Sequence, residues 1–103
     1  MGTVKYDLEE ITKQITTVAG TGSVALPTGL AEIAKQIVCT PATASTMFTF
    51  QLLNTNDSDS VVFERDADGV LNEIEDIPLY GEYKAKITGA TANELFKIRI
   101  LHI

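Results

Sequence analysis

The chain has 103 residues, of which 45% are hydrophobic and 21% are charged, and its formal net charge at pH 7 is −6. This composition is typical of one globular domain and argues against a disordered chain. The acidic balance disfavours a protein that binds nucleic acid or an anionic membrane, since both need a basic surface. Cys39 is the only cysteine, which excludes an internal disulfide and a thiol-rich metal site.

The first residues carry no targeting signal that we recognise. Residues 1–10 (MGTVKYDLEE) contain no long apolar run, so we expect no signal peptide and synthesis in the cytoplasm. No stretch approaches the ~20 apolar residues of a membrane span. We expect a single domain over residues 1–103, in which residues 1–30 are the least defined part and could form an arm.

The first 40 residues contain a repeated pattern. Residues 8–15 (LEEITKQI) recur as residues 30–37 (LAEIAKQI), with six of eight positions identical. As a helix each copy would place its leucine and isoleucines on one stripe, whereas as a strand the isoleucines would share one face. The β-branched residues that follow each copy favour a strand, so we predict a short helical turn or irregular segment followed by a strand. A duplicated element and chance similarity both remain open.

Short strands bounded by turn-forming residues account for the rest of the chain. The predicted strands are residues 23–26, 36–40, 46–54, 61–65, 70–77, 83–88 and 96–100. Pro41 should end one of them, because proline cannot donate to a central ladder. About seven or eight short strands separated by regular turn signals predict an all-β fold, an antiparallel β-sandwich of jelly-roll or immunoglobulin-like type.

The clearest alternation lies in residues 80–103. Apolar residues there alternate with charged and polar ones, as they do in a half-buried strand. The residues predicted to face the core are Tyr83, Ala85, Ile87, Phe96, Ile98 and Ile100. Residues 89–93 supply turn chemistry, so we predict a hairpin at the centre of the core. Asp68 and Gly69 predict a second hairpin, between residues 61–65 and 70–77.

Acidic residues are concentrated in the middle of the chain. Residues 51–79 hold eight acidic side chains against Arg65, a net −7, whereas residues 80–103 carry a net +2. Two acidic loops, residues 54–59 and 66–68, could meet around Ca²⁺, which takes oxygen ligands. Neither loop has the register of a calcium-binding loop, and Asn and Asp favour turns for local reasons, so we expect no metal. The side chains concerned are Asp57, Asp59, Asp66 and Asp68.

Candidate catalytic residues are few. His102, the only histidine, lies in register with the predicted core residues of its strand, so we expect it to cap the core. Cys39 lies in an apolar strand, where a buried, inert thiol is expected. Acids in residues 73–76 could act as acid and base only inside a cleft, and a solvated strand edge explains them more simply. We therefore expect neither an enzyme nor a bound cofactor.

Two features point to binding instead. Tyrosines could stack against a sugar, although they lie in separate contexts; they are Tyr6, Tyr80 and Tyr83. If the phenylalanines at 48, 50 and 96 face inward, a row of apolar residues faces outward, and such clusters mark contact surfaces. This predicted interface comprises Met47, Leu53, Val62, Leu101 and Ile103, with Lys97 and Arg99 at its rim. Burial of strand ends on both faces would explain the apolar row equally well.

A family resemblance extends over residues 33–103. Residues 35–46 (KQIVCTPATAST), a Phe-rich strand, an Asp-Gly turn and the segment from Leu79 (LYGEYKAKITGAT) resemble small β-sandwich virion proteins of tailed bacteriophages. The matching residues are Val38, Pro41, Ala42, Ser45, Thr46, Gly81, Tyr83, Ile87, Gly89 and Ala90. The resemblance implies a non-enzymatic structural role, either capsid decoration (cement) or a head–tail neck or tail component.

The same resemblance implies partners and a location. The partners would be other virion proteins, capsid or neck, together with further copies of this chain, and neither nucleic acid nor membrane. The protein would be made in the host cytoplasm and found in the virion. The rival hypothesis is a carbohydrate-binding or receptor-binding β-sandwich module.

Overall fold

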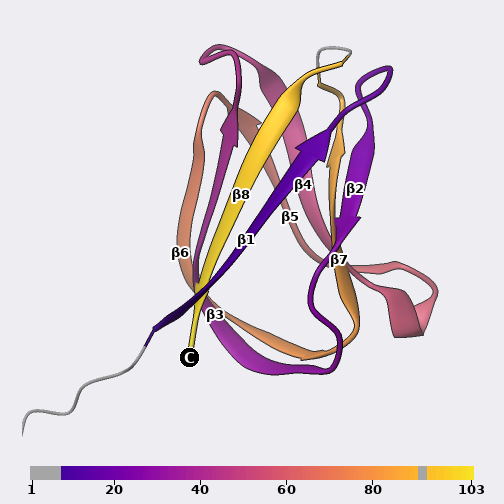
Figure 1. Cartoon of the computed structure of the whole chain (residues 1–103), viewed down its shortest axis with the longest axis vertical. Coiled ribbons are helices and arrows are strands. Elements are labelled where there is room, and N and C mark those ends of the chain that lie inside the picture. Colours follow the sequence, from indigo (N-terminus) through magenta and orange to yellow (C-terminus); the bar gives the residue numbers. More distant parts are fainter. Residues whose placement is uncertain (1–7, 91–92) are drawn as a thin grey trace, which may run out of the picture.

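The computed structural model describes residues 8–90 and 93–103, which form eight strands and one short 3-10 turn (Figure 1). The strands are β1 (Glu9–Thr16), β2 (Gly22–Ala25), β3 (Leu30–Pro41), β4 (Met47–Asn54), β5 (Ser60–Asp68), β6 (Leu71–Gly81), β7 (Tyr83–Thr88) and β8 (Leu95–His102). The turn η1 (Thr55–Asp57) follows β4. No helix in this described part is long and apolar enough to cross a membrane.

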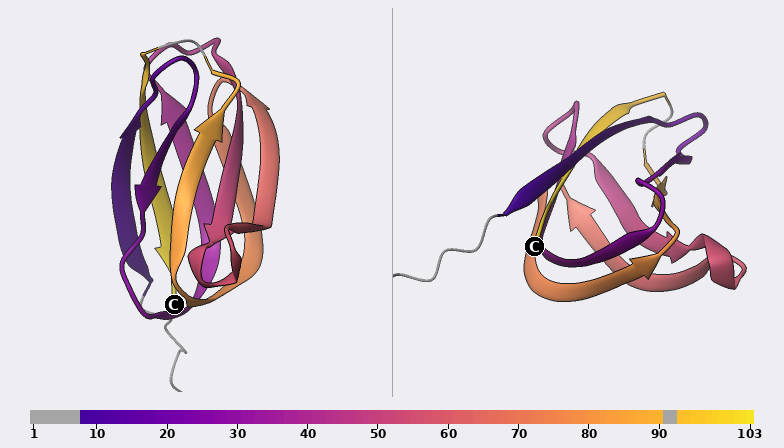
Figure 2. Two further views of the ribbon diagram at one scale, coloured as in Figure 1. Left: turned by 90° about the vertical axis from the view of Figure 1, so that its right-hand side faces the viewer. Right: turned by 60° about the horizontal axis from the view of Figure 1, so that its bottom comes forward.

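The strands form two antiparallel sheets of four strands each. The first sheet has the order β1-β8-β3-β6, and the second sheet has the order β2-β7-β4-β5. Figure 2 (left) shows β2 and β7 of the second sheet in front of β3 and β8 of the first sheet. This order is that of a jelly roll. The predicted antiparallel β-sandwich is therefore confirmed.

The hydrophobic core fills the space between the two sheets. Every residue predicted to face the core from β4, β7 and β8 is buried, with Phe50 and Phe96 at 0% exposure. Phe48 of the second sheet meets Phe96 of the first edge to face, with ring centroids 4.9 Å apart. Such pairs add to the stabilisation that burial provides. The alternation in these strands thus identified the inner faces of both sheets.

Both predicted hairpins are wrong. β5 and β7 belong to the second sheet, whereas β6 and β8 belong to the first, so each connection crosses from one sheet to the other. Alternation along a strand reports which face is buried, but it does not report which strand lies beside it. Within the described residues, the consecutive strands that pair are β4 and β5.

The crossing from β5 to β6 depends on Gly69. Its φ of +89° lies in the left-handed region, and a Cβ there would stand 2.6 Å from the carbonyl oxygen of Ala44. Its N–H donates to the carbonyl of Thr46 at 2.8 Å. The Asp-Gly signal therefore marks a close approach between two connections at one end of the sandwich.

The repeated pattern forms strands throughout, so the predicted helical turns are wrong. β1 and β3 lie on either side of β8, where Ile11 and Ile37 both oppose Ile100. In the sequence repeat, however, Ile11 matches Ile33 and not Ile37. The two copies are therefore shifted along β8 and do not occupy equivalent positions. Within the segment 1–30, which could have formed an arm, residues 9–16 and 22–25 lie in the two sheets, and residues 1–7 fall outside the described residues.

Candidate contact surface

The solvent-facing side of the first sheet carries exposed apolar residues. Ile74 is 78% exposed and Tyr80 is 61% exposed, both on the edge strand β6. Further apolar residues on β3 and at the end of β8 are half-buried on the same face. We refer to the whole group as the outer patch; it comprises Ile33, Ile74, Pro78, Tyr80, Leu101 and Ile103.

Strand register brings these residues together. Gln36 lies between Ile74 of β6 and Leu101 of β8, which forms one row across the sheet. In the next row Pro78 opposes Ile33, and Ile33 exchanges backbone hydrogen bonds of 3.2 and 3.1 Å with Ile103. Neighbouring side chains on one sheet face stand about 5 Å apart. The outer patch therefore spans three strands, with Gln36 between Ile74 and Leu101 and the Lys35–Asp76 pair between the two rows.

Ion pairs lie beside the outer patch. Lys35 contacts Asp76 at 2.9 Å, and Arg99 contacts Glu10 at 3.1 Å. All four side chains are more than a third exposed, so each pair contributes only about 0–1 kcal/mol to stability. Their larger effect is to leave little unpaired charge next to the apolar residues.

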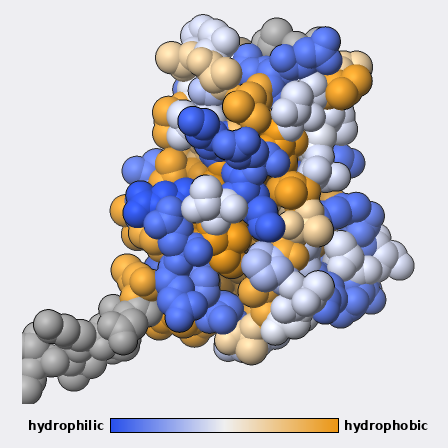
Figure 3. All heavy atoms as spheres, viewed as in Figure 1, coloured by the Kyte–Doolittle hydropathy of each residue, from blue (hydrophilic) through white to orange (hydrophobic). Residues whose placement is uncertain are grey.

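The solvent-facing side of the second sheet carries polar pairs along its middle and apolar residues towards its ends. Thr49 donates a hydrogen bond of 2.7 Å to Asp66 across β4 and β5, and Gln51 donates to Glu64 in the next row. Met47 at one end is 69% exposed, and Val61 and Val62 at the start of β5 are 50% and 42% exposed. Polar residues on the solvent side are usual for an antiparallel sheet. Figure 3 shows hydrophobic and hydrophilic residues intermixed on the side where β1 lies in front.

The predicted outward row is divided by the fold. Leu101 and Ile103 belong to the outer patch, with Lys97 and Arg99 exposed on the same strand. The remaining residues lie on the second sheet: Met47 and Val62 are exposed, and Leu53 is buried. The row is therefore not one surface, because the two sheets turn their outer faces in opposite directions.

The outward position predicted for Leu53 is wrong, since this residue is only 4% exposed. The register irregularity at Leu52 and Leu53 adds one residue, Val62, to β5, while β4 stays in regular register with β7. The turn after β4 is held against β7, where Asp59 contacts Lys84 at 2.8 Å. Lys84 is also the residue that opposes Leu53. Leu53 therefore lies next to this held turn, which accounts for its burial.

The two acidic loops do not meet. Residues 54–59 precede β5 and residues 66–68 end it, so residues 60–65 of the extended strand separate them. The seven residue steps from Asp59 to Asp66 span about 23 Å, far more than the diameter of a calcium site. Among the described residues, no group of three or more His, Cys, Asp or Glu side chains could hold a metal ion.

The candidate nucleophile is inaccessible. Cys39 is 0% exposed, and its burial raises the pKa of the thiol from 9.0 to about 12. The neutral thiol is therefore the form present near neutral pH, and it is a poor nucleophile. His102 is buried at the end of β8, as predicted, and its Nδ1 lies 3.1 Å from Oε2 of Glu32.

The acids of residues 73–76 lie along the edge strand and not in a cleft. Arg65 of β5 contacts Glu75 at 2.7 Å and Glu73 at 3.8 Å. The same guanidinium lies over the ring of Phe63, 4.4 Å from its centroid. Arg65 therefore connects the edges of the two sheets and neutralises part of the acidic segment.

The two tyrosines among the described residues do not form a stacking platform. Tyr83 is 6% exposed, and its hydroxyl donates to the carbonyl of Tyr80 at 3.0 Å and accepts from its N–H at 2.9 Å. This hydroxyl fastens the corner between β6 and β7, while the ring of Tyr80 faces solvent. Tyr6 lies outside the described residues.

One buried acid was not anticipated. Glu94 is 7% exposed, and its Oε1 accepts a hydrogen bond of 2.9 Å from Thr46. Its backbone carbonyl accepts from the N–H of Thr17 at 2.8 Å. Glu94 thus joins three connections at one end of the sandwich. Sequence patterns do not identify such a residue, because it precedes β8 and belongs to no alternation.

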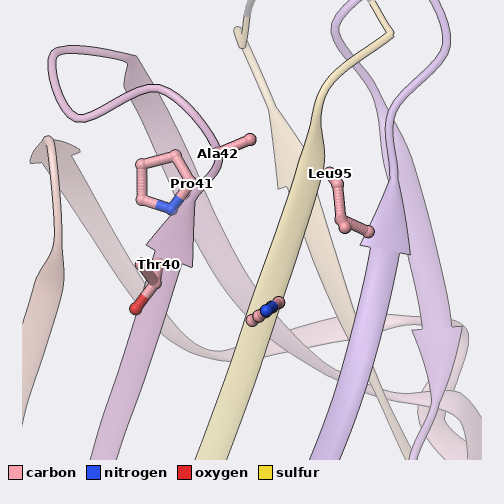
Figure 4. A pocket seen from close by; sticks show the side chains of 5 residues that line it. Thr40, Pro41, Ala42 and Leu95 are labelled. Atoms are coloured by element: carbon pink, nitrogen blue, oxygen red, sulfur yellow. The ribbon is translucent and has the colours of Figure 1, made fainter.

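A shallow hollow lies between the ends of β3 and β8. Figure 4 shows Thr40, Pro41 and Ala42 on one side and Leu95 across from them, and Lys97 completes the lining. This set contains one charged group and no carboxylate, imidazole or thiol. It therefore offers no pair of groups for acid–base or nucleophilic catalysis.

Comparisons with known proteins extend only to overall architecture. No family model and no curated protein matches the chain. One similar solved structure is the Yersinia pseudotuberculosis-derived mitogen, with a TM-score of 0.46 and 12% identity over 91% of this chain and 84% of the other. Another is the carbohydrate-binding module CBM36 in complex with calcium and xylotriose, with a TM-score of 0.43 and 10% identity over 92% of each chain.

A third match is the structure of infectious bursal disease virus, Gx strain. Its TM-score is 0.37 and its identity 13%, over 93% of this chain and 31% of the other. All three TM-scores are below 0.5, so these matches carry no functional argument. The chain is an eight-stranded β-sandwich with jelly-roll strand order.

Proposed function

We propose that the protein is a non-enzymatic structural component of a tailed-bacteriophage virion that binds the capsid shell as a decoration (cement) protein. The observation that carries the proposal is the outer patch, an apolar surface on a sheet face where polar residues are usual. The resemblance of residues 33–103 to small phage virion proteins supports the virion assignment.

The outer patch has the composition of a protein–protein contact. Aromatic and large aliphatic side chains such as Tyr80 and Ile74 are suited to the centre of an interface, where most binding energy is concentrated. Lys35–Asp76 and Arg99–Glu10 lie beside the patch. Exposed charges in that position affect the association rate and the choice of partner more than the affinity.

Repetition on a shell would compensate for the modest size of the patch. A four-stranded sheet face measures roughly 20 by 30 Å, below the ~800 Å² per partner of a standard interface. A decoration protein meets identical sites at every symmetric position of the shell, and linked copies bind with a high effective concentration. We therefore expect binding that depends on shell assembly.

The test is co-sedimentation of the purified protein with empty capsids of the phage whose genome encodes it. We expect the wild-type protein and Met47→Asp to sediment with capsids, and Ile74→Asp to remain in the supernatant. Both residues are exposed, so neither substitution should unfold the domain; circular dichroism checks this. Met47 is the matched control because it is an exposed apolar residue on the opposite outer face.

Three outcomes would contradict the proposal. Sedimentation of Ile74→Asp like the wild type would exclude the outer patch as the capsid contact. Binding to isolated necks or tails instead of capsids would move the protein to a neck or tail position. Retention on glycans in place of any virion part would favour the carbohydrate-binding alternative.

A further inference from the structure

The outer edge of β1 carries backbone groups without partners. β1 is the end strand of the first sheet, where its neighbour is β8, and Figure 2 (left) shows β1, in indigo, along one margin of the sandwich. Ile103 exchanges backbone hydrogen bonds with Ile33, so its backbone groups point toward β3. These groups alternate in direction along a strand. The backbone groups of His102 and Ile100 therefore point the other way, toward β1.

The same alternation sets the direction of the backbone groups in β1. Glu9 and Ile11 lie opposite those two residues of β8, so their groups bond across the β1–β8 ladder. The N–H and carbonyl groups of Glu10, Thr12 and Gln14 therefore point away from β8. Among the described residues, these groups make no hydrogen bond. A further strand placed beside β1 would satisfy them.

The opposite edge of the first sheet resists such an addition. The backbone groups of Ile33 point toward Ile103, so Ile33 and Pro78 do not form a hydrogen-bonded pair. The nitrogen of Pro78 therefore faces the open side of β6, where proline cannot donate to an added strand. A register shift next to Ala34 also breaks the regularity of the β3–β6 ladder. β6 thus has two features that oppose strand addition.

The edges of the second sheet are protected in other ways. β2 has four residues and is too short to pair firmly. On β5, Glu64 and Asp66 are exposed, and Arg65 between them reaches Glu75 of β6 at 2.7 Å. Charges of this kind discourage edge pairing. β1, by contrast, has eight residues in unbroken register with β8 and contains no proline.

Lys13 restricts which strand can pair with β1. It lies between Ile11 and Ile15 on the core-facing side, where the two isoleucines are buried and Lys13 is half-buried. A charge in this position resists an arbitrary strand but favours one with a carboxylate opposite. β1 itself carries such a group, Glu9, and within the described ranges neither Lys13 nor Glu9 forms an ion pair. The sequence of β1 is thus complementary to itself.

We propose that β1 pairs antiparallel with β1 of a second copy of the chain, about a two-fold axis that passes beside Ile11. In this register Glu10 exchanges backbone hydrogen bonds with Thr12 of the second copy. Lys13 lies opposite Glu9 of the second copy, and the symmetry forms this ion pair twice. Ile11 meets Ile11 of the second copy in a non-hydrogen-bonded pair, where facing side chains come closest.

The neighbouring registers fit less well. The free backbone groups belong to even-numbered residues in both copies, so even-numbered residues must pair with each other. The register on one side brings Glu10 opposite Glu10 of the second copy. The register on the other side places Lys13 opposite Ile11, and the one beyond it places Lys13 opposite Lys13. Like charges directly opposite each other are destabilising, so charge selects the register centred on Ile11.

The dimer would join the first sheets of two copies into one sheet, because β1 is the end strand of each. The two outer patches would then lie on the same side of that sheet and offer a shell a larger surface than one domain does. The pairing goes beyond the proposed function and does not rest on it. Assembly through the outer patch is a separate contact.

Sedimentation velocity and amide hydrogen exchange on the purified full chain test the pairing. We expect a reversible dimer with a dissociation constant on the order of 0.1 mM, since the contact is one pair of strands. The amides of Glu10, Thr12 and Gln14 should then exchange about fourfold more slowly at ~1 mM protein than at ~10 µM, as the dimer fraction rises. A chain that stays monomeric at ~1 mM overturns the proposal.

Charge exchange tests the register. Lys13→Glu and Glu9→Lys each place like charges opposite each other in the dimer, so each variant alone should self-associate at least tenfold more weakly. An equal mixture of the two should dimerise like the wild type, because every glutamate then faces a lysine. Glu64→Lys, at an exposed acid on β5, is the matched control and should dimerise normally. Single variants that dimerise normally, or a mixture that does not recover, overturn the proposal.

Thr12→Pro tests the backbone contact. It removes an N–H that is free in the single copy, so the β1–β8 ladder should persist and circular dichroism should be unchanged. Dimerisation should fall at least tenfold, and a folded Thr12→Pro that dimerises normally overturns the proposal. Ile74→Asp, the variant that tests the capsid contact, should still dimerise. Dimers that Ile74→Asp abolishes, without protection of the β1 amides, would assign the contact between copies to the outer patch and overturn the pairing of β1.

Discussion

The outer faces of the two sheets differ although the same core supports both. On the second sheet, side chains facing solvent satisfy one another across strands, as Thr49 and Asp66 do. On the first sheet, Ile74 and Leu101 occupy equivalent positions and have no such partners among the hydrogen bonds and ion pairs of the described residues. These apolar residues of the first sheet belong to the contact surface that we propose.

The largest expected effect separates the two faces directly. Leu101→Asp should abolish assembly through the outer patch, with the shell or with other copies of the chain, because it places a charge at the centre of this patch. The isolated domain should stay folded, since Leu101 is half-buried on the outer face and not in the core. Sedimentation velocity measures assembly, and circular dichroism checks folding. A folded Leu101→Asp variant that assembles normally would exclude the outer patch as the contact surface.

Truncating a core residue should destabilise the protein far more than truncating a residue on an outer face. Ile98→Ala should lower the free energy of unfolding by about 2–5 kcal/mol, because Ile98 is 1% exposed and its truncation leaves a cavity. Ile74→Ala should change it by less than about 0.5 kcal/mol. Urea unfolding measures both values. An effect of Ile98→Ala below about 0.5 kcal/mol would show that Ile98 lies outside the core.

Within the second sheet, truncation of the buried Leu53 should destabilise the protein more than truncation of the exposed Met47. Leu53→Ala should cost about 1–3 kcal/mol, since Leu53 is buried but does not belong to the main core cluster. Met47→Ala should cost less than about 0.5 kcal/mol. Equal costs in urea unfolding would mean that the turn after β4 does not cover Leu53 in solution.

Charged residues at the margin of the outer patch should affect the rate of association with the partner. Reversal of Lys97 and Arg99 to glutamate should alter the salt dependence of association more than the affinity at moderate salt, because both side chains are exposed. Association rates between about 50 and 300 mM NaCl measure the effect. Loss of binding at every salt concentration would place these residues at the centre of the contact instead.

Removal of metal ions should have no effect on stability. EDTA should leave the melting temperature unchanged, because the two acidic loops lie at opposite ends of β5. Differential scanning calorimetry with and without chelator tests this. A drop of several degrees that Ca²⁺ restores would reinstate the aspartates of those loops as ligands.

The sequence predicted the buried faces well and the neighbours of each strand poorly. The alternation of Tyr83, Ala85 and Ile87 reflects burial, which is a local property of a strand. Which strands pair depends on contacts between residues far apart in the chain, and the turn signal at Gly69 does not distinguish a hairpin from a crossing between sheets. The burial of Leu53 was not predicted, because it depends on the turn after β4, which Asp59 holds against Lys84 of β7.

Two of the six residues of the outer patch were predicted from the sequence. Leu101 and Ile103 follow directly from the inward set of β8. Ile74 was available too, since it lies between the acids Glu73 and Glu75, but an isolated apolar residue on an acidic edge has no meaning until β3 and β8 are placed beside it. The contact between His102 and Glu32 was not predictable either, because it joins β8 and β3 from distant parts of the chain.

The position of β8 has a consequence for biosynthesis. β8 lies between β1 and β3 and provides the backbone partners that join them into one sheet. Until the ribosome has released β8, β1 has no neighbour within its sheet, and the β3–β6 pair has one edge open. Open strand edges recruit other strands, and contacts between distant residues form slowly. The nascent chain should therefore be most prone to aggregate just before β8 emerges, and high expression should favour misassembly at that stage.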